Sequence, residues 1–289
     1  MDNLATTVAI QFFNGLVIGM IYALIGIGLT LILGLLDIPN FAHGALYALG
    51  AYLLLQLVGV TGSFWLGMLV APVIVFTVSV ILERFMIRPL YPAGSNYVLL
   101  FTFAVSVIVQ ELIIILWGPV GFSILPPQAL AGSVDLGPFS YPRYHLFVMI
   151  ASLAVILGLW LMLERTRYGA IMRAGIENKT MVSALGIDIY RLFTVGFGLG
   201  ASLAALAGVL IAPIRGLMPY MGVDILPFAF VVVAVGGLGN VIGAIAAGLI
   251  IGVTQSLTTQ FWPQGSTITI FGVMAIILLT RPQGLFGAR

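Results

Sequence analysis

The residues of this chain that could bind a polar solute stand at three interruptions of otherwise apolar sequence. Asn40 and His43 lie in the stretch IPNFAHG, where Asn40 could cap the helix that follows, and the free N–H groups of a helix start attract carboxylates. Glu111 lies inside the apolar run VIVQELIIIL, and Asn240 follows the glycine-rich break GGLG. A charged side chain at membrane depth costs about 2.5–3.5 kcal/mol on insertion scales, so it usually serves a function. We predict that Asn40, His43, Glu111 and Asn240 line a path for solute.

Three of these four positions also have a structural explanation. Asn40 and His43 could form a capped loop with a satisfied histidine, which is the explanation that the chemistry alone favours. Glu111 could be a carboxyl group that is buried between helices for packing, or one that is kept protonated. A secondary transporter driven by protons or sodium generally needs an acidic relay inside the membrane, and a single glutamate gives little support for one.

The motifs of ATP hydrolysis and of common hydrolases are missing from the sequence. A P-loop needs G-x-x-x-x-G-K-[ST], but the only lysine is Lys179, and Asn178 precedes it. Neither His43 nor His145 is followed by Glu, so no H-E-x-x-H zinc motif occurs, and no G-x-S-x-G is present. The absence of cysteine excludes thiolate chemistry. We expect that the chain is not an enzyme and binds no metal or cofactor of its own.

The composition is that of an integral membrane protein. Hydrophobic residues make up 61% of the 289 residues and charged residues only 7%, against about 25% charged residues in soluble domains. Apolar runs of about 20 residues, the length that spans a bilayer as a helix, recur along the chain. We predict one all-α transmembrane domain over residues 1–289, a bundle of eight or nine helices. The expected spans are 9–35, 42–59, 64–82, 97–117, 145–163, 192–213, 240–260 and 266–280, with 225–235 as a short span or a re-entrant segment.

The basic residues predict the orientation, because cytoplasmic loops are enriched in Lys and Arg. We place loop 83–96, loop 164–191 and the C-terminal tail in the cytoplasm. The N-terminus, the loop 118–144, and Arg215 with Asp224 then lie on the outer side. The net charge is +2, and the charged residues lie mostly in loops between spans. We therefore expect lipid to surround the spans, and we do not expect nucleic acid as a partner.

The loop 164–191 holds eight of the twenty charged residues of the chain. Orientation explains its arginines but not the short helix pattern in its middle. Asn178 is a suitable N-cap, and Gly186 suits the left-handed conformation that ends a helix. Met181, Val182 and Leu185 fall on one apolar face. Such a helix either lies on its own bundle or the membrane surface, or inserts its apolar face into a groove of a partner.

The stretch ENKTMVSALGI, residues 177–187, resembles the cytoplasmic coupling loop of permease subunits of ABC importers. The similarity is greatest to the Liv type, which serves branched-chain or hydrophobic amino acids. It extends along nearly the whole chain, through FNGLVIGMIYALIGIGLTLILGLLDIPNFAHGALYALGAYL (13–53), ERTRYGAIMRA (164–174), VGGLGNVIGAIAAGLI (235–250) and RPQGLFG (281–287). Thr180 and Met181 stand where the general signature has Glu and Ala, and the later Leu-Pro is missing.

This resemblance implies a permease subunit in a bacterial inner membrane, crossing it several times. The implied partners are a second, homologous permease subunit, two ATP-binding subunits that use ATP and Mg, and a periplasmic or lipoprotein substrate-binding protein. The solute would be a branched-chain or hydrophobic amino acid, or a related small solute such as urea, an amide or a small organic acid. The residues that would couple to the ATPase are Glu177, Asn178, Met181, Val182, Ala184, Leu185 and Gly186.

Two other functions fit a polytopic bundle without a P-loop. A stand-alone secondary transporter would move solute without nucleotide and would tolerate substitution of Gly186. A membrane scaffold that transports nothing would show no dependence on solute, whichever residue is changed.

Overall fold

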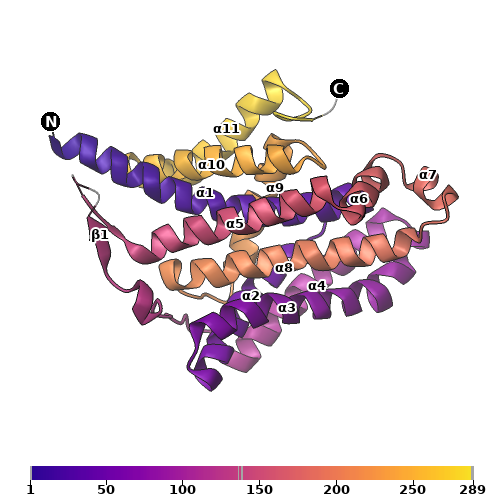
Figure 1. The fold of residues 1–289 in the computed structure, drawn as a ribbon, viewed down its shortest axis with the longest axis horizontal. Coiled ribbons are helices and arrows are strands. Elements are labelled where there is room, and N and C mark those ends of the chain that lie inside the picture. The colour runs from indigo at the N-terminus through magenta and orange to yellow at the C-terminus, as the bar shows by residue number, and fades with distance from the viewer. Residues whose placement is uncertain (1, 136, 138, 288–289) are drawn as a thin grey trace.

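The computed structural model describes residues 2–135, 137 and 139–287, and it is a bundle of helices with one small hairpin of strands (Figure 1). Within these residues, eight helices are long and apolar enough to span a membrane, which confirms the predicted all-α membrane fold. The long helices are α1 (Asp2–Leu36), α2 (Ala42–Thr61), α3 (Phe64–Leu82), α4 (Ser95–Trp117), α5 (Arg143–Arg165), α8 (Ile189–Arg215), α10 (Val241–Phe261) and α11 (Ser266–Thr280). The shorter elements are α6 (Arg167–Glu177), α7 (Lys179–Ala184), α9 (Met221–Gly236), β1 (Ser133–Asp135) and β2 (Ser140–Pro142).

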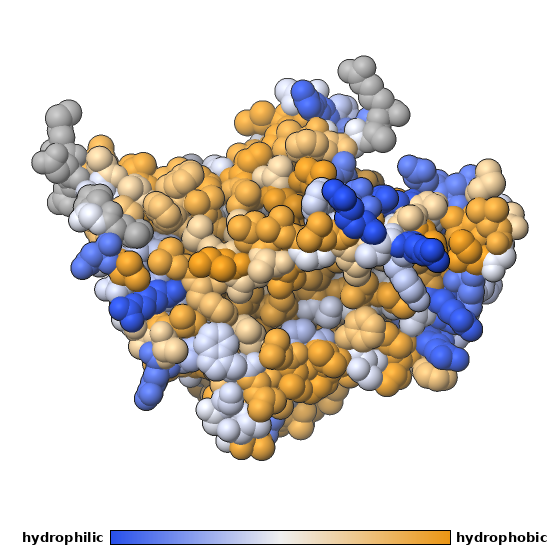
Figure 2. Space-filling model, viewed as in Figure 1, coloured by the Kyte–Doolittle hydropathy of each residue, from blue (hydrophilic) through white to orange (hydrophobic). Residues whose placement is uncertain are grey.

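The surface of the bundle has the polarity expected of a membrane protein. In Figure 2 an apolar zone covers the middle of the visible face, and hydrophilic side chains gather toward its two ends. Helices α1 and α8 are the most buried of the candidate spans, whereas α3, α4, α5 and α11 expose most of their length. The bundle is therefore built around α1 and α8, and its outer helices present apolar side chains to lipid or to a partner.

The segments that we predicted to be cytoplasmic gather at one end of the bundle, which we call the basic end. Arg88 donates a hydrogen bond to the carbonyl oxygen of Tyr190 (3.2 Å), and the backbone N–H of Leu285 donates one to Val235 (2.8 Å). Figure 1 places α6 and α7 at this end, with the N-terminus and the β1–β2 hairpin at the other, the opposite end. The predicted grouping of loops is confirmed, and the cytoplasmic assignment of the basic end stays a prediction.

The loop 83–96 is more helical than we predicted. A π-helical turn, η1 (Glu83–Ile87), continues α3 directly, and a 3-10 helix, η2 (Arg88–Ala93), follows it. Pro89 and Pro92 lie in this second part, and because proline has no N–H they prevent a regular α-helix there.

Small residues let α1 and α10 pack with their backbones in contact. Gly15 and Gly19 of α1 face Gly252 and Gly248 of α10, and a Cβ built on Gly19 would lie 2.9 Å from the Cα of Leu249. Glycines spaced as G-x-x-x-G are typical of helices that pack closely in membranes. The pairing is antiparallel, so α10 begins at the basic end and runs toward the opposite end.

Helices α2 and α9 both begin inside the bundle rather than at one of its ends. His43, in the first turn of α2, lies against Ile25 of α1, eleven residues before Leu36 ends α1, which is about 16 Å along the helix. Gly44 in turn touches Gly222 in the first turn of α9, and a Cβ on either residue would overlap the backbone oxygen of the other. The two helix starts therefore meet at membrane depth.

The run 225–235, predicted as a short span or a re-entrant segment, belongs to α9. This helix begins beside Gly44 and ends at Gly236 at the basic end, where the tail pairs with it. Its 16 residues cover about 24 Å. Because the chain has already entered the interior of the bundle before the helix starts, this length is enough to reach the basic end. The structure thus favours the short span over a segment that returns to the same side.

Candidate translocation and coupling sites

The start of α2 is held by hydrogen bonds from outside the helix. The side-chain Oδ1 of Asn40 accepts a bond from the backbone N–H of Ala42 (3.0 Å), and Oγ1 of Thr102 in α4 accepts one from Phe41 N–H (3.2 Å). Asn40 thus satisfies one N–H group of the helix start, as we predicted, but Phe41 and not Asn40 is the N-cap residue. These bonds satisfy two of the N–H groups that a helix start leaves free.

Asn40 and His43 also carry buried polar atoms that have no partner among the described residues. His43 Nε2 lies 3.0 Å from the carbonyl oxygen of Ile25, which requires Nε2 to hold the hydrogen and donate. The other ring nitrogen, Nδ1, and the Nδ2 amide of Asn40 are both buried and unpaired. An unsatisfied buried polar group costs about 1–3 kcal/mol, and such groups usually bind water or a ligand. The structural explanation, a histidine with all its hydrogen bonds satisfied, therefore accounts for Nε2 of His43 but not for its Nδ1 or for the Asn40 amide.

Glu111 lies on the outward face of α4. It is exposed, and its neighbours Ile108, Leu112 and Ile115 on the same helix are exposed by 57%, 47% and 74%. A carboxyl group buried between helices of this chain, one of our two structural explanations, is therefore excluded. An exposed carboxyl group amid apolar side chains at membrane depth is costly in lipid, so this face is suited to contact with protein or water.

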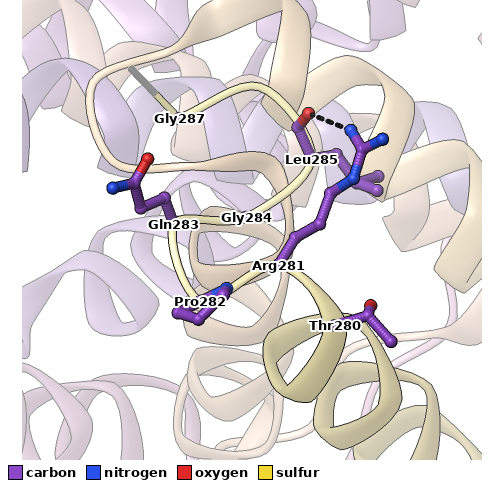
Figure 3. A pocket seen from close by; sticks show the side chains of 7 residues that line it. All are labelled: Thr280, Arg281, Pro282, Gln283, Gly284, Leu285 and Gly287. Carbon is purple, nitrogen blue, oxygen red and sulfur yellow. Dashed lines mark hydrogen bonds between the residues drawn. The ribbon is translucent and has the colours of Figure 1, made fainter. Parts of the chain in front are cut away.

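Asn240 lies at the basic end, away from the start of α2. Its Oδ1 accepts a hydrogen bond from Gly243 N–H (2.9 Å) and so caps α10, and its Nδ2 donates to the carbonyl oxygen of Phe286 (2.8 Å). The tail to which it binds curls around a cavity of about 470 Å³ lined by residues 280–285 and 287 (Figure 3). Both polar atoms of Asn240 thus have backbone partners, and the structure brings only Asn40 and His43 together among the four path candidates.

Helix α7, for which we predicted a coupling role, has the two ends that the sequence predicted. Asn178 is its N-cap, with Oδ1 accepting from Met181 N–H (2.9 Å), and Gly186 adopts a left-handed φ of 79°. The expected apolar face divides: Val182 is 2% exposed, whereas Met181 and Leu185, which we call the apolar pair, are 61% and 73% exposed. The other predicted coupling residues, Glu177, Asn178, Ala184 and Gly186, are also exposed.

A buried carboxylate that we did not predict lies at the basic end. Glu83 is fully buried, and it accepts hydrogen bonds from Tyr91 (2.9 Å), from Thr194 of α8 (2.6 Å) and from Arg88 (3.1 Å), with which it forms an ion pair. A buried carboxylate is tolerated when it is paired and hydrogen-bonded in this way. The only nearby residue that could indicate a partner for Glu83 is Arg88, five positions later, and we predicted this stretch to be an exposed basic loop.

Comparisons with known proteins show the family of the chain. The family described as "Branched-chain amino acid transport system / permease component" matches residues 11–279. LivH, a permease protein of the high-affinity branched-chain amino acid transport system of Salmonella typhimurium (strain LT2), is 30% identical over 96% of this chain and 94% of that protein. BraD of Pseudomonas aeruginosa, a permease protein of a system with the same description, is 29% identical over 96% and 95%. LivM, another permease protein from the same Salmonella strain, is 26% identical over 92% of this chain and 68% of that protein.

Proposed function

Because this chain belongs to the family of permease components of branched-chain amino acid transport systems, we propose that it is the membrane-spanning subunit of an ATP-driven importer. Its solute would be a branched-chain or hydrophobic amino acid, or a related small solute. It would work in a bacterial inner membrane, with the basic end in the cytoplasm. A second permease, two ATP-binding subunits and a substrate-binding protein would complete the complex.

The observation that carries this proposal is the apolar pair on α7. Met181 and Leu185 lie on a helix capped at both ends, and they expose most of their side chains at the basic end. Exposed apolar side chains on a fixed helix are typical of a surface that inserts into a groove of another protein. Since the sequence has no P-loop of its own, an ATPase is the partner that would supply the energy for uptake.

Pairing with a second permease is supported by the outward face of α4. Glu111 and the exposed apolar residues around it would be covered by a second subunit, and the shared boundary would hold the path for solute. The relatives LivH and LivM are two permease proteins from one Salmonella strain, and both carry the same description of their transport system. In this proposal Asn40, His43 and Glu111 contact solute on its way, and Asn240 stays a candidate at the basic end.

The test is co-purification of an ATP-hydrolysing protein with this chain in mild detergent from membranes of its own cell. The double variant Met181→Asp/Leu185→Asp should lose the ATPase, because two carboxylates cannot enter an apolar groove without a large desolvation cost. The control Met181→Leu/Leu185→Met keeps the apolar surface and should retain it. If no ATPase accompanies the unmodified chain, and vesicles take up leucine with an ion gradient alone, the chain is a secondary transporter instead.

A further inference from the structure

A polar cavity lies at the opposite end of the bundle, outside both sites described above. Its volume is about 240 Å³, and its walls come from the first half of α1, the start of α5 and the ends of α8 and α10. Its lining includes polar residues such as Gln11, Asn14, Arg215 and Gln255, and also the apolar residues Val17, Ile18 and Ile214. The cavity thus offers both polar and apolar groups to one small molecule.

Hydrogen bonds to neighbouring residues occupy the acceptor atoms of the amide side chains that line the cavity. The phenol of Tyr22, which is buried, donates to Oε1 of Gln255 (2.6 Å). The phenol of Tyr141 donates to Oδ1 of Asn14 (3.0 Å), and Ser256 donates to Oε1 of Gln11 (2.9 Å). Burial raises the pKa of the Tyr141 phenol, so it stays protonated as this donor. The oxygens of all three amides are therefore taken.

The groups that remain without a partner are mainly donors. Nε2 of Gln255 takes part in no hydrogen bond within the described residues. Arg215 interacts with the phenol of Tyr22, but no carboxylate in the described part of the chain lies within ion-pair distance of it, so its positive charge is not neutralised. Nδ1 of His145 is buried and also has no partner in this part of the chain. Arg215 is the one formally charged side chain among the residues lining the cavity, so the unpaired groups favour an anion.

We propose that this cavity is a binding site for a small solute that carries a carboxylate and an apolar body. The guanidinium of Arg215 binds the carboxylate in the bidentate way that its planar geometry favours, and the amide of Gln255 donates a further bond. Val17, Ile18 and Ile214 contact the apolar body. The choice of a branched-chain amino acid as the natural solute rests on the proposed function, whereas the carboxylate rests on the cavity itself.

The experiment measures binding of leucine to the purified chain in lipid nanodiscs, without any substrate-binding protein, by equilibrium dialysis. Leucinol has the same side chain without the carboxylate, and 4-methylpentanoate has the carboxylate without the amine. We expect leucine and 4-methylpentanoate to bind and leucinol to bind at least 10-fold more weakly. Equal binding of leucine and leucinol, or no binding of either acid, overturns the proposal.

Variants of Arg215 test whether this residue binds the carboxylate. Arg215→Gln should weaken leucine binding at least 10-fold, because it replaces a charged bidentate donor by a neutral one, and Arg215→Lys should weaken it less. Arg143→Gln is the matched control, because Arg143 lies at the start of α5 at the same end but does not line the cavity. Unchanged binding in Arg215→Gln overturns the proposal. An unaltered melting temperature in each variant shows that the fold is intact.

A phospholipid headgroup is another anion that an arginine could hold. Native mass spectrometry of the nanodisc-extracted chain distinguishes it: a phosphatidylglycerol that stays bound and that leucine does not displace overturns the proposal, and displacement by leucine supports it. This result is independent of the ATPase test. If the unmodified chain brings down no ATPase, the proposed importer is contradicted. If leucine still binds, also in Met181→Asp/Leu185→Asp, the binding site in the cavity is nevertheless supported.

Discussion

Lys179 of α7 and Asp37, the residue after α1, form an ion pair with 2.5 Å between Nζ and Oδ2. Lys179 also lies over the ring of Phe193 in α8, 5.7 Å from its centroid. Asp37 has a φ of 57° and is the one non-glycine residue with positive φ in the described part of the chain. It begins the short segment that leads to Asn40 and His43. The ion pair therefore joins the proposed ATPase-docking helix to the chain that enters the membrane beside the solute candidates.

Breaking this ion pair should uncouple uptake from ATP without unfolding the protein. The pair is partly exposed, with Asp37 76% exposed, and exposed pairs contribute only about 0–1 kcal/mol to stability. We expect Lys179→Gln and Asp37→Asn to lower ATP-dependent solute uptake about 5-fold or more, a modest coupling energy, while the melting temperature and ATPase association stay unchanged.

The charge-reversed double variant Lys179→Asp/Asp37→Lys should recover part of the uptake, since it restores an ion pair. Arg191→Gln is the control, because Arg191 at the start of α8 forms an exposed pair with Asp188 but no ion pair with α1 or Asp37 in the described part of the chain. If the single variants transport normally, or if Arg191→Gln has the same effect, the ion pair has no special role in coupling.

The buried Glu83 should matter for stability. Glu83→Ala removes the acceptor of Arg88, Tyr91 and Thr194, and loss of one partner of a buried pair costs about 3–5 kcal/mol. Because Arg88 is 27% exposed and water can solvate it, we expect about 2–3 kcal/mol. Thermal unfolding in detergent measures this. Glu164→Ala, at an exposed pair with Arg173, should change the melting temperature little, and an equal loss in both variants would contradict the burial argument.

The contrast between Asn178 and Glu83 shows what the sequence could predict. The caps of α7 depend on residues within one turn, Asn178 with Met181 and Gly186 with Ser183, so local chemistry sufficed. The spans followed from hydropathy in the same way. Glu83 is satisfied by Thr194, 111 positions away, and the ion pair of Lys179 reaches back to Asp37. Contacts of this kind depend on how α1, α3 and α8 pack, which composition and periodicity do not specify.

The meeting of two helix starts inside the bundle had no signal in the sequence either, and it makes Gly44 a sensitive position. Gly44→Ala would place a methyl group on the backbone oxygen of Gly222. Neither backbone can yield easily, so we expect a loss of stability of about 1–3 kcal/mol or more from overpacking, measured as a lower melting temperature.

Gly158→Ala provides the comparison, because Gly158 lies in α5 and a Cβ there meets nothing within 4 Å. Alanine is favoured over glycine inside a helix by about 0.5–1 kcal/mol, so this variant should be as stable as the unmodified chain or slightly more so. A Gly44→Ala protein that melts at the same temperature as Gly158→Ala would show that α2 and α9 separate without cost.

Glu111 offers a direct test of whether the outward face of α4 meets water or lipid. The chain contains no cysteine, so Glu111→Cys introduces a single thiol, and thiols react with maleimides as thiolates, which form in water but not in lipid. In the assembled complex we expect a water-soluble maleimide to modify Cys at position 111, since a solute path admits water. Leu153→Cys, on the exposed side of α5, should stay unmodified because it faces lipid. If position 111 is as unreactive as position 153 while the complex transports solute, Glu111 does not line the path.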